Sequence, residues 1–79
     1  MKRITLFTRE GCHLCEVAHH ALERVKEASP FDLEVIDLDR EAPDKLAAYT
    51  YEVPVVELEG RKIMKYRVDE ARLLRLLAE

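Results

Sequence analysis

The chain has 79 residues and a mass of 9.2 kDa, so we expect one domain, residues 1–79, with one small hydrophobic core. Thirteen Lys and Arg against sixteen Asp and Glu give a net charge of −3, which argues against a nucleic-acid partner, since nucleic-acid-binding proteins usually present a basic face. No apolar run is long enough to cross a membrane or to form the centre of a signal peptide.

The first half of the chain predicts a strand, a helix and a second strand. Residues 3–7 form a short strand with apolar side chains on both of its faces, which indicates a central strand. Residues 14–28 have helical periodicity, and Ser29-Pro30 ends that helix. Residues 31–38 alternate as a second strand. The apolar stripe of the helix contains Leu14, Ala18, Ala21, Leu22 and Val25.

The second half predicts a short helix over 43–49, a hairpin of strands 53–58 and 61–66 turning at Glu59-Gly60, and a last helix capped by Asp69. The resulting order is β-α-β-α-β-β-α. The connection between the first two strands makes them parallel, and the hairpin is antiparallel. The sequence therefore predicts an α/β fold with a four-stranded mixed sheet flanked by three helices.

The only cysteines are Cys12 and Cys15. A pair this close closes a loop too short to stabilise a fold, whereas a small secreted protein usually carries four or more cysteines. We interpret the pair as chemical or metal-binding, and we expect the protein in the reducing, cytoplasmic compartment.

The spacing of these cysteines suits thiol–disulfide exchange. Cys12 falls at the start of the helix, where free backbone N–H groups and the helix dipole stabilise a thiolate. Cys15 lies one turn further along the same face, deeper in the fold and within reach of the first sulfur. Gly11 allows the backbone to turn tightly and leaves the Cys12 sulfur open.

A second element is Val53-Pro54, where a proline interrupts an otherwise good strand. One interpretation is a cis bond beside a site, with the Val53 backbone free to pair with an extended substrate. The other is a proline that simply begins the strand.

With these residues in view, the sequence resembles the glutaredoxins of the thioredoxin-fold superfamily. The resemblance is carried by residues 8–15 (TREGCHLC), by Val53-Pro54-Val55-Val56 and by Gly60. It implies a thioredoxin-like fold and a thiol–disulfide oxidoreductase with a redox-active Cys12–Cys15 disulfide. Cys12 is then the nucleophile, Cys15 the resolving thiol, Pro54 the cis-proline, and Arg9 a residue that steadies the thiolate or a glutathione carboxylate.

Two positions depart from that family. His13-Leu14 replaces the Pro-Tyr common between the cysteines. The stretch Met64-Lys65-Tyr66-Arg67-Val68-Asp69-Glu70 stands where glutaredoxins carry a glutathione-binding Gly-Gly followed by Asp, and in it only Asp69 could still offer a ligand contact. This C-H-L-C variant leaves glutathione uncertain as a partner. We expect protein or small-molecule disulfides as substrates, a reducing thiol or a reductase as electron donor, no cofactor beyond the disulfide itself, no bound metal, and a monomer.

Three alternatives stay open. His13 either favours the Cys12 thiolate electrostatically or is a solvated residue of the first turn. The two cysteines could instead carry a metal ion or an iron–sulfur cluster with His19, which is four residues from Cys15 and shares its helix face, although the chain offers no other Cys or His beyond His13 and His20. The absence of Asn and Gln indicates a thermophilic source or chance in a short chain.

Overall fold

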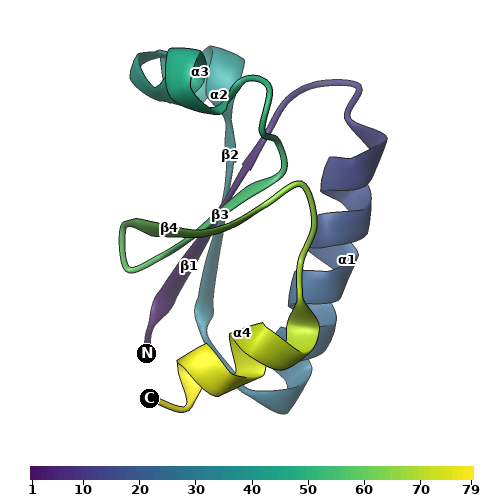
Figure 1. Ribbon diagram of the computed structural model, residues 1–79, viewed down its shortest axis with the longest axis vertical. Coiled ribbons are helices and arrows are strands. Elements are labelled where there is room, and N and C mark those ends of the chain that lie inside the picture. The colour runs from purple at the N-terminus through teal and green to yellow at the C-terminus, as the bar shows by residue number, and fades with distance from the viewer.

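The computed structural model describes residues 1–79 (Figure 1). Its strands are β1 (Arg3–Thr8), β2 (Asp32–Asp37), β3 (Val55–Leu58) and β4 (Arg61–Lys65). Its helices are α1 (His13–Ala28), α2 (Leu38–Glu41), α3 (Pro43–Tyr49) and α4 (Glu70–Leu77). None of the helices combines the length and the apolar character that a membrane crossing requires.

The four strands form one mixed sheet in the order β2-β1-β3-β4. β1 pairs in parallel with β2 and antiparallel with β3, and β3 pairs antiparallel with β4. β1 is thus a central strand, and its residues 4–7 are all buried, the polar Thr5 included, as apolar side chains on both faces of the strand predict. The predicted α/β architecture is confirmed.

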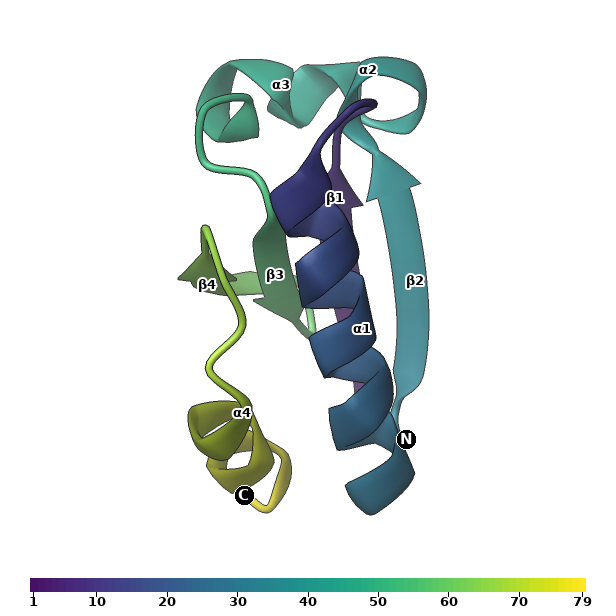
Figure 2. The same ribbon diagram turned by 90° about the vertical axis from the view of Figure 1, so that its right-hand side faces the viewer.

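Helices cover both faces of this sheet, but unequally. α1 and α4 pack on one face over a core that includes Ile4, Leu6, Leu22, Phe31 and Leu73 (Figure 2). α2 and α3 lie across one end of the molecule, where Leu38 and Ala42 pack against Phe7 and Val55 (Figure 1). The loop that connects β1 to α1 lies at the same end of the molecule, so the two short helices lie beside the start of α1.

The buried stripe of α1 differs from the prediction at one position. Leu14 is 56% exposed, and Cys15 takes the place expected for it, with only 4% exposed. The reason is the phase of the helix, because Cys15 is spaced three residues before Ala18 and seven before Leu22, as a single helix face requires. Leu14 is turned about 100° away from that face. Leu14, which directly precedes Cys15, is therefore a surface residue.

The prediction of three helices was wrong by one short element. α2 has four residues and follows directly from β2, where the sequence suggested the end of a strand. The cause is local, since the Asp37 carboxylate accepts hydrogen bonds from the N–H groups of Asp39 (2.9 Å) and Arg40 (3.4 Å) and so caps a helical turn.

The turns of the second half follow the predicted chemistry. Glu59 and Gly60 both have positive φ, 51° and 82°, as a two-residue hairpin turn between twisted strands requires. Asp69 caps α4 by accepting a 3.0 Å hydrogen bond from the N–H of Arg72. β3 begins at Val55, two residues later than expected, because Pro54 has no N–H to donate to a ladder.

Candidate functional site

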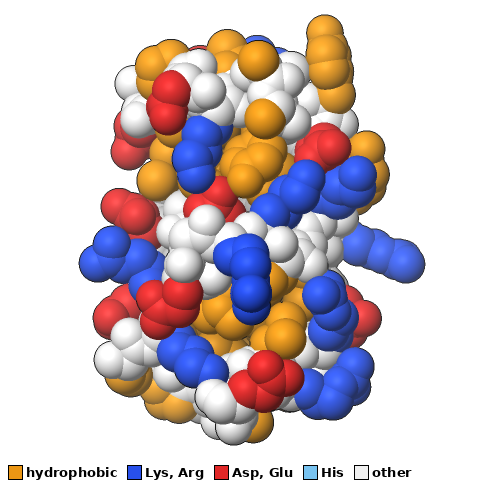
Figure 3. Space-filling view, turned by 60° about the vertical axis from the view of Figure 1, so that its left-hand side comes forward, with side chains coloured by type: hydrophobic (Ala, Val, Ile, Leu, Met, Phe, Trp, Pro, Cys, Tyr) orange, Lys and Arg blue, Asp and Glu red, His pale blue; other side chains and the backbone are white.

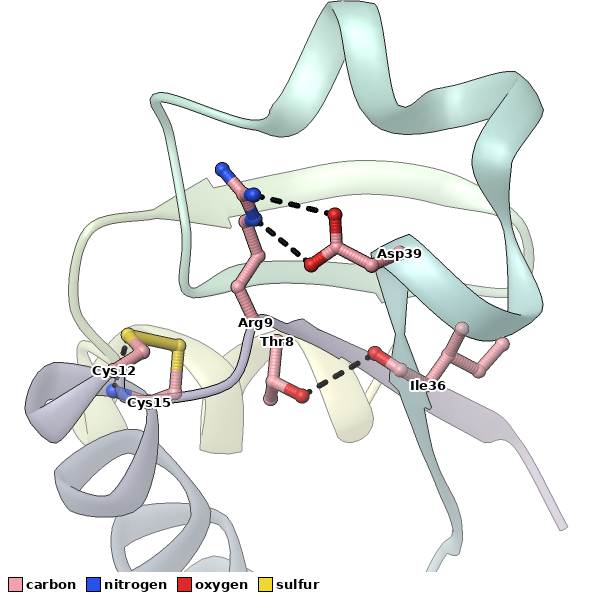
Figure 4. The surroundings of a disulfide bond; sticks show 6 residues. All are labelled: Thr8, Arg9, Cys12, Cys15, Ile36 and Asp39. Atoms are coloured by element: carbon pink, nitrogen blue, oxygen red, sulfur yellow. Dashed lines mark hydrogen bonds and ion pairs between the residues drawn. A yellow bond between two sulfur atoms is a disulfide. The ribbon is translucent and has the colours of Figure 1, made fainter.

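The two cysteines lie at the junction of the β1–α1 loop and the first turn of α1 (Figure 4). Gly11 turns the chain with a φ of 77°, a conformation that favours glycine, and nothing lies within 4 Å of the place where a Cβ would stand. Cys12 follows as the N-cap of α1. The predicted role of Gly11 in turning the backbone is thus supported by its geometry.

The sulfur of Cys12 lies over the N-terminus of α1. It accepts a hydrogen bond from the N–H of Cys15 at 3.1 Å, so one of the free donors of the first turn points directly at it. The same N–H and the dipole of a 16-residue helix favour a negative charge on this sulfur once the disulfide is reduced.

Cys12 and Cys15 differ in exposure and are joined by a disulfide (Figure 4). Cys12 is partly exposed, whereas Cys15 is 4% exposed and packs with the buried side of α1. An incoming reagent can therefore reach the first sulfur more readily than the second. This asymmetry is the one predicted from the sequence.

A small cavity of about 210 Å³ opens beside the two sulfurs, on the side of α1 that faces β2. Its wall includes two side chains of α1: Glu16, which the sequence did not indicate, and His19, which the sequence placed on the same helix face as Cys15. His19 is paired with Glu23 at 3.2 Å across one helical turn. A helical spacing of four from Cys15 was the only sequence signal that His19 would lie near the cysteines.

The Val53–Pro54 peptide bond is cis, as the first of the two interpretations of this dipeptide predicts, whereas pairing of Val53 with a substrate stays a prediction. Val55 pairs with Phe7, so Pro54 and Val53 continue beside the end of β1 from which the loop to Cys12 departs. The N–H and C=O of Val53 have no hydrogen-bond partner. The carbonyl of Pro54, by contrast, accepts the N–H of Tyr66 at 2.8 Å.

Arg9 points away from the sulfurs (Figure 4). Its guanidinium forms a two-pronged contact with the carboxylate of Asp39, at 3.1 and 3.2 Å, and its Nη1 also donates to the hydroxyl of Thr50. The loop before Cys12 is thereby tied to α2 and to the end of α3. The guanidinium of Arg9 is paired with Asp39, and Arg9 also lines the cavity beside the two sulfurs, so its role toward the thiolate or a glutathione carboxylate stays a prediction.

His13 and Tyr51, on either side of the site, lie on the surface. His13 is the exposed first residue of α1, and it forms no side-chain hydrogen bond. Tyr51 is 89% exposed beside Val53. No group of three or more His, Cys, Asp or Glu residues is arranged to hold a metal ion.

Beneath the loop that carries Pro54, α3 is fixed to β3 by a buried carboxylate. Glu57 is 4% exposed and accepts the hydroxyl of Tyr49 at 2.8 Å and the ammonium of Lys45 at 2.9 Å. The ring of Tyr49 also meets Phe7 edge to face, with centroids 5.3 Å apart. Both polar contacts come from residues of α3, so they hold the start of the 50–54 loop in place.

Burial of Tyr49, followed by its hydrogen bond to Glu57 and the negative charges of Glu57 and Glu52, raises the pKa of its phenol to about 12. The stability linked to this group is therefore present below the usual tyrosine pKa of about 10 and is lost as the pH rises through about 12. We expect Tyr49→Phe to remove the last of the tyrosine ionisation steps in a phenolate absorbance titration. If the highest step persists in Tyr49→Phe, the assignment is wrong.

Comparison with known proteins agrees with this geometry. The family described as "Glutaredoxin-like domain (DUF836)" matches residues 3–78. A glutaredoxin-like protein of Dictyostelium discoideum is 35% identical over 75 residues, covering 89% of this chain and 69% of that protein. An uncharacterized protein of Mycobacterium tuberculosis is also 35% identical, covering 90% of this chain and 77% of its own length.

Solved structures support the same relationship. The solution structure of a Nitrosomonas europaea protein superposes with a TM-score of 0.83 at 30% identity, covering 95% of this chain and 89% of that one. A mutant thioredoxin from Halobacterium salinarum, at 21% identity, shares the fold with a TM-score of 0.70 over 96% of this chain and 71% of its own. The sulfur pair, the cis-proline and these similarities together show that the chain belongs to the glutaredoxin-like family within the thioredoxin-fold superfamily.

Proposed function

We propose that this protein is a thiol–disulfide oxidoreductase that uses Cys12 as its nucleophile and Cys15 as its resolving thiol. The observation that carries the proposal is the position of the Cys12 sulfur. It is the more exposed of the pair, it accepts an N–H of the first turn of α1, and it is close enough to Cys15 for a disulfide. These are the conditions under which a thiolate is stabilised and reactive.

The reaction begins with the reduced pair. The Cys12 thiolate attacks one sulfur of a substrate disulfide, a Cys12–substrate disulfide forms, and the other substrate sulfur leaves as a thiolate that takes up a proton. Cys15 then loses its proton and attacks the sulfur of Cys12. The Cys12–Cys15 disulfide forms, the second substrate thiol is released, and two electrons have passed to the substrate. A reducing thiol or a reductase restores the pair by the reverse exchange.

The Val53 backbone offers a place for the substrate chain. Its N–H and C=O have no partner, and it lies at the end of β1 from which the loop to Cys12 starts. An extended segment could pair with these two groups as a short antiparallel strand. Such pairing holds many peptides and selects among them weakly, which suits a protein that acts on several disulfides.

The segment after β4 favours protein disulfides over glutathione as substrates. Tyr66 has a φ of 71° and carries a side chain where a glycine would leave the backbone open. Its N–H is already donated to the carbonyls of Pro54 and Glu52. A tripeptide would therefore find fewer free backbone groups here than the Gly-Gly pattern of glutaredoxins provides.

We expect dithiol-driven reduction of a protein disulfide to be faster than glutathione-coupled reduction of a small mixed disulfide, at equal enzyme concentration. Tyr66→Gly is the informative variant, because it removes the side chain that covers this stretch of backbone and should raise the glutathione-coupled rate more than the protein-disulfide rate. A wild-type glutathione-coupled rate that clearly dominates would contradict the substrate preference. No turnover of either substrate would contradict the proposed oxidoreductase activity itself.

The alternative function, a carrier of a metal ion or an iron–sulfur cluster, predicts instead a bound metal or cluster in anaerobically purified protein.

A further inference from the structure

Charge is distributed very unevenly along this acidic chain. Residues 61–68 contain four cations, Arg61, Lys62, Lys65 and Arg67, and no acid. Residues 1–60 hold seven Lys and Arg against thirteen Asp and Glu, whereas residues 61–79 hold six against three. A net −3 protein thus carries a positive C-terminal quarter, which neither the fold nor the disulfide chemistry explains.

The structure gathers this charge at a cleft along the sheet edge. The cleft has a volume of about 400 Å³ and lies between β4 and the start of α4. Its charged wall consists of Lys62, Lys65, Arg67 and Arg72 with a single acid, Asp69. We call these four cations the basic cleft. In Figure 3, blue Lys and Arg side chains occupy much of the middle and right of the face that is shown.

The charges of the basic cleft are incompletely neutralised within the chain. Lys62 and Lys65 share one carboxylate, Glu52, at 2.9 and 3.3 Å. Arg72 donates to the carbonyl of Ile63 at 2.6 Å, which satisfies a donor without cancelling its charge. Arg67 is exposed and has no hydrogen-bond or ion-pair partner. The cleft therefore retains a positive field that can attract an anionic partner.

A second groove, lined mostly by apolar side chains together with the Arg24–Glu70 ion pair, borders the basic cleft. It lies between α1 and the segment after β4, and its walls include Leu14, Val17, Tyr66 and Arg67. Leu14 stands between the two cysteines, and Leu14, Val17 and Tyr66 are 56%, 49% and 49% exposed. Arg67 borders both the groove and the basic cleft. Leu14 follows Cys12 by two residues in the first turn of α1, so the groove begins within one helical turn of the reactive cysteine.

We propose that the basic cleft docks an acidic, extended polypeptide segment of the protein whose disulfide reacts with Cys12. This inference rests on the proposed function and specifies its substrate class. A polypeptide fits both parts of the surface, because its apolar side chains can cover Leu14, Val17 and Tyr66 while its carboxylates meet Arg67 and Arg72.

The first test measures binding without thiol chemistry. A fluorescent peptide carries glutamates on both sides of an apolar centre and of a serine that stands in for the reactive cysteine, and a matched peptide carries glutamines. We expect the wild-type protein to bind the glutamate peptide about tenfold more tightly at low salt, with an advantage that shrinks as salt screens the charges. Arg67→Glu should abolish that advantage, and the milder Arg67→Gln should reduce it.

Arg40→Glu is the matched control. Arg40 is an exposed arginine of α2 without a side-chain partner, and α2 follows β2, the strand at the opposite edge of the sheet. It should leave the preference for glutamate intact. Equal binding of the two peptides, or an equal loss in Arg40→Glu and Arg67→Glu, overturns the proposal. Stronger competition by a single-stranded oligonucleotide or by glutathione than by the unlabelled glutamate peptide also overturns it.

Disulfide exchange with the cysteine-containing versions of both peptides separates this inference from the proposed function. Exchange that is equally fast with both peptides leaves the oxidoreductase standing and removes the docking surface. A binding preference for the glutamate peptide without any exchange keeps the docking surface and removes the oxidoreductase.

Discussion

Cys12→Ser is expected to abolish disulfide exchange, whereas Cys15→Ser is expected to stop it halfway. Without the Cys12 thiolate no bond to the substrate forms, because the only other thiol, that of Cys15, is buried. Without Cys15 the first step still occurs, but nothing inside the protein attacks the mixed disulfide, so the Cys12–substrate adduct accumulates. Intact mass spectrometry after incubation with a disulfide-containing protein distinguishes the two outcomes.

The pair of variants forms its own control. Serine is close in size to cysteine at both positions, so the fold should be retained and circular dichroism should confirm it. We expect turnover to fall by orders of magnitude in both variants and an adduct of one substrate chain only in Cys15→Ser. Full turnover by Cys12→Ser, or an adduct on Cys15 in that variant, would contradict the assignment of the nucleophile.

The second large effect concerns stability. Leu22 is fully buried on the inner face of α1, where it belongs to the core that joins α1 to the sheet. Leu22→Ala removes apolar contacts and leaves a cavity, which typically costs about 2–5 kcal/mol. A chain of this size has a free energy of unfolding of about 4–12 kcal/mol, so the loss is a large fraction of the total. We expect a marked fall in the denaturation midpoint in urea.

Leu14→Ala provides the matched control for this prediction. It is the same substitution on the same helix, at a side chain that is 56% exposed. Its cost should stay within about 0.5 kcal/mol, as is usual at surface positions. A loss of stability in Leu14→Ala as large as that in Leu22→Ala would show that the burial pattern of α1 is wrong.

The elements that the sequence predicted correctly have local causes. Residues 3–7 include apolar side chains on both faces of the strand, and only a central strand buries both of its faces. Glu59-Gly60 accepts two positive φ angles in succession, and Asp69 accepts the N–H groups of the turn that follows it. Cys12 and Cys15 are three residues apart at the start of a helix, so their proximity follows from helix geometry alone.

The features that the sequence did not reveal depend on contacts between distant residues. The partner of Arg9 is Asp39, thirty positions further along the chain, and no local pattern indicates that pairing. Glu57 is buried only because Tyr49 and Lys45 of α3 reach it, and β3 alone gives no sign of those partners. Leu14 was placed on the wrong face because the start of α1 decides its phase, and apolar periodicity fixes a helix start only within a few residues.

The same distinction explains the basic cleft. Arg61, Lys62, Lys65 and Arg67 are adjacent in sequence and could have been noticed as a charged run. Their meaning depends on the fold, which brings Arg72 of α4 beside them and places Leu14 of α1 across the groove from Arg67. A charged run is usually a solvated surface, and here the cleft and its unpaired arginine set it apart.

The proposed chemistry requires that the N-terminus of α1 makes Cys12 a stable and reactive thiolate. The most direct measurement is the rate of alkylation of Cys12 against pH in Cys15→Ser, with Cys15 in Cys12→Ser measured in parallel. We expect the alkylation rate of Cys12 to rise at a pH well below the free-thiol pKa of about 8.5, and Cys12 to react faster than Cys15 at every pH. A Cys12 profile centred at or above that value, or faster alkylation of Cys15, would contradict it.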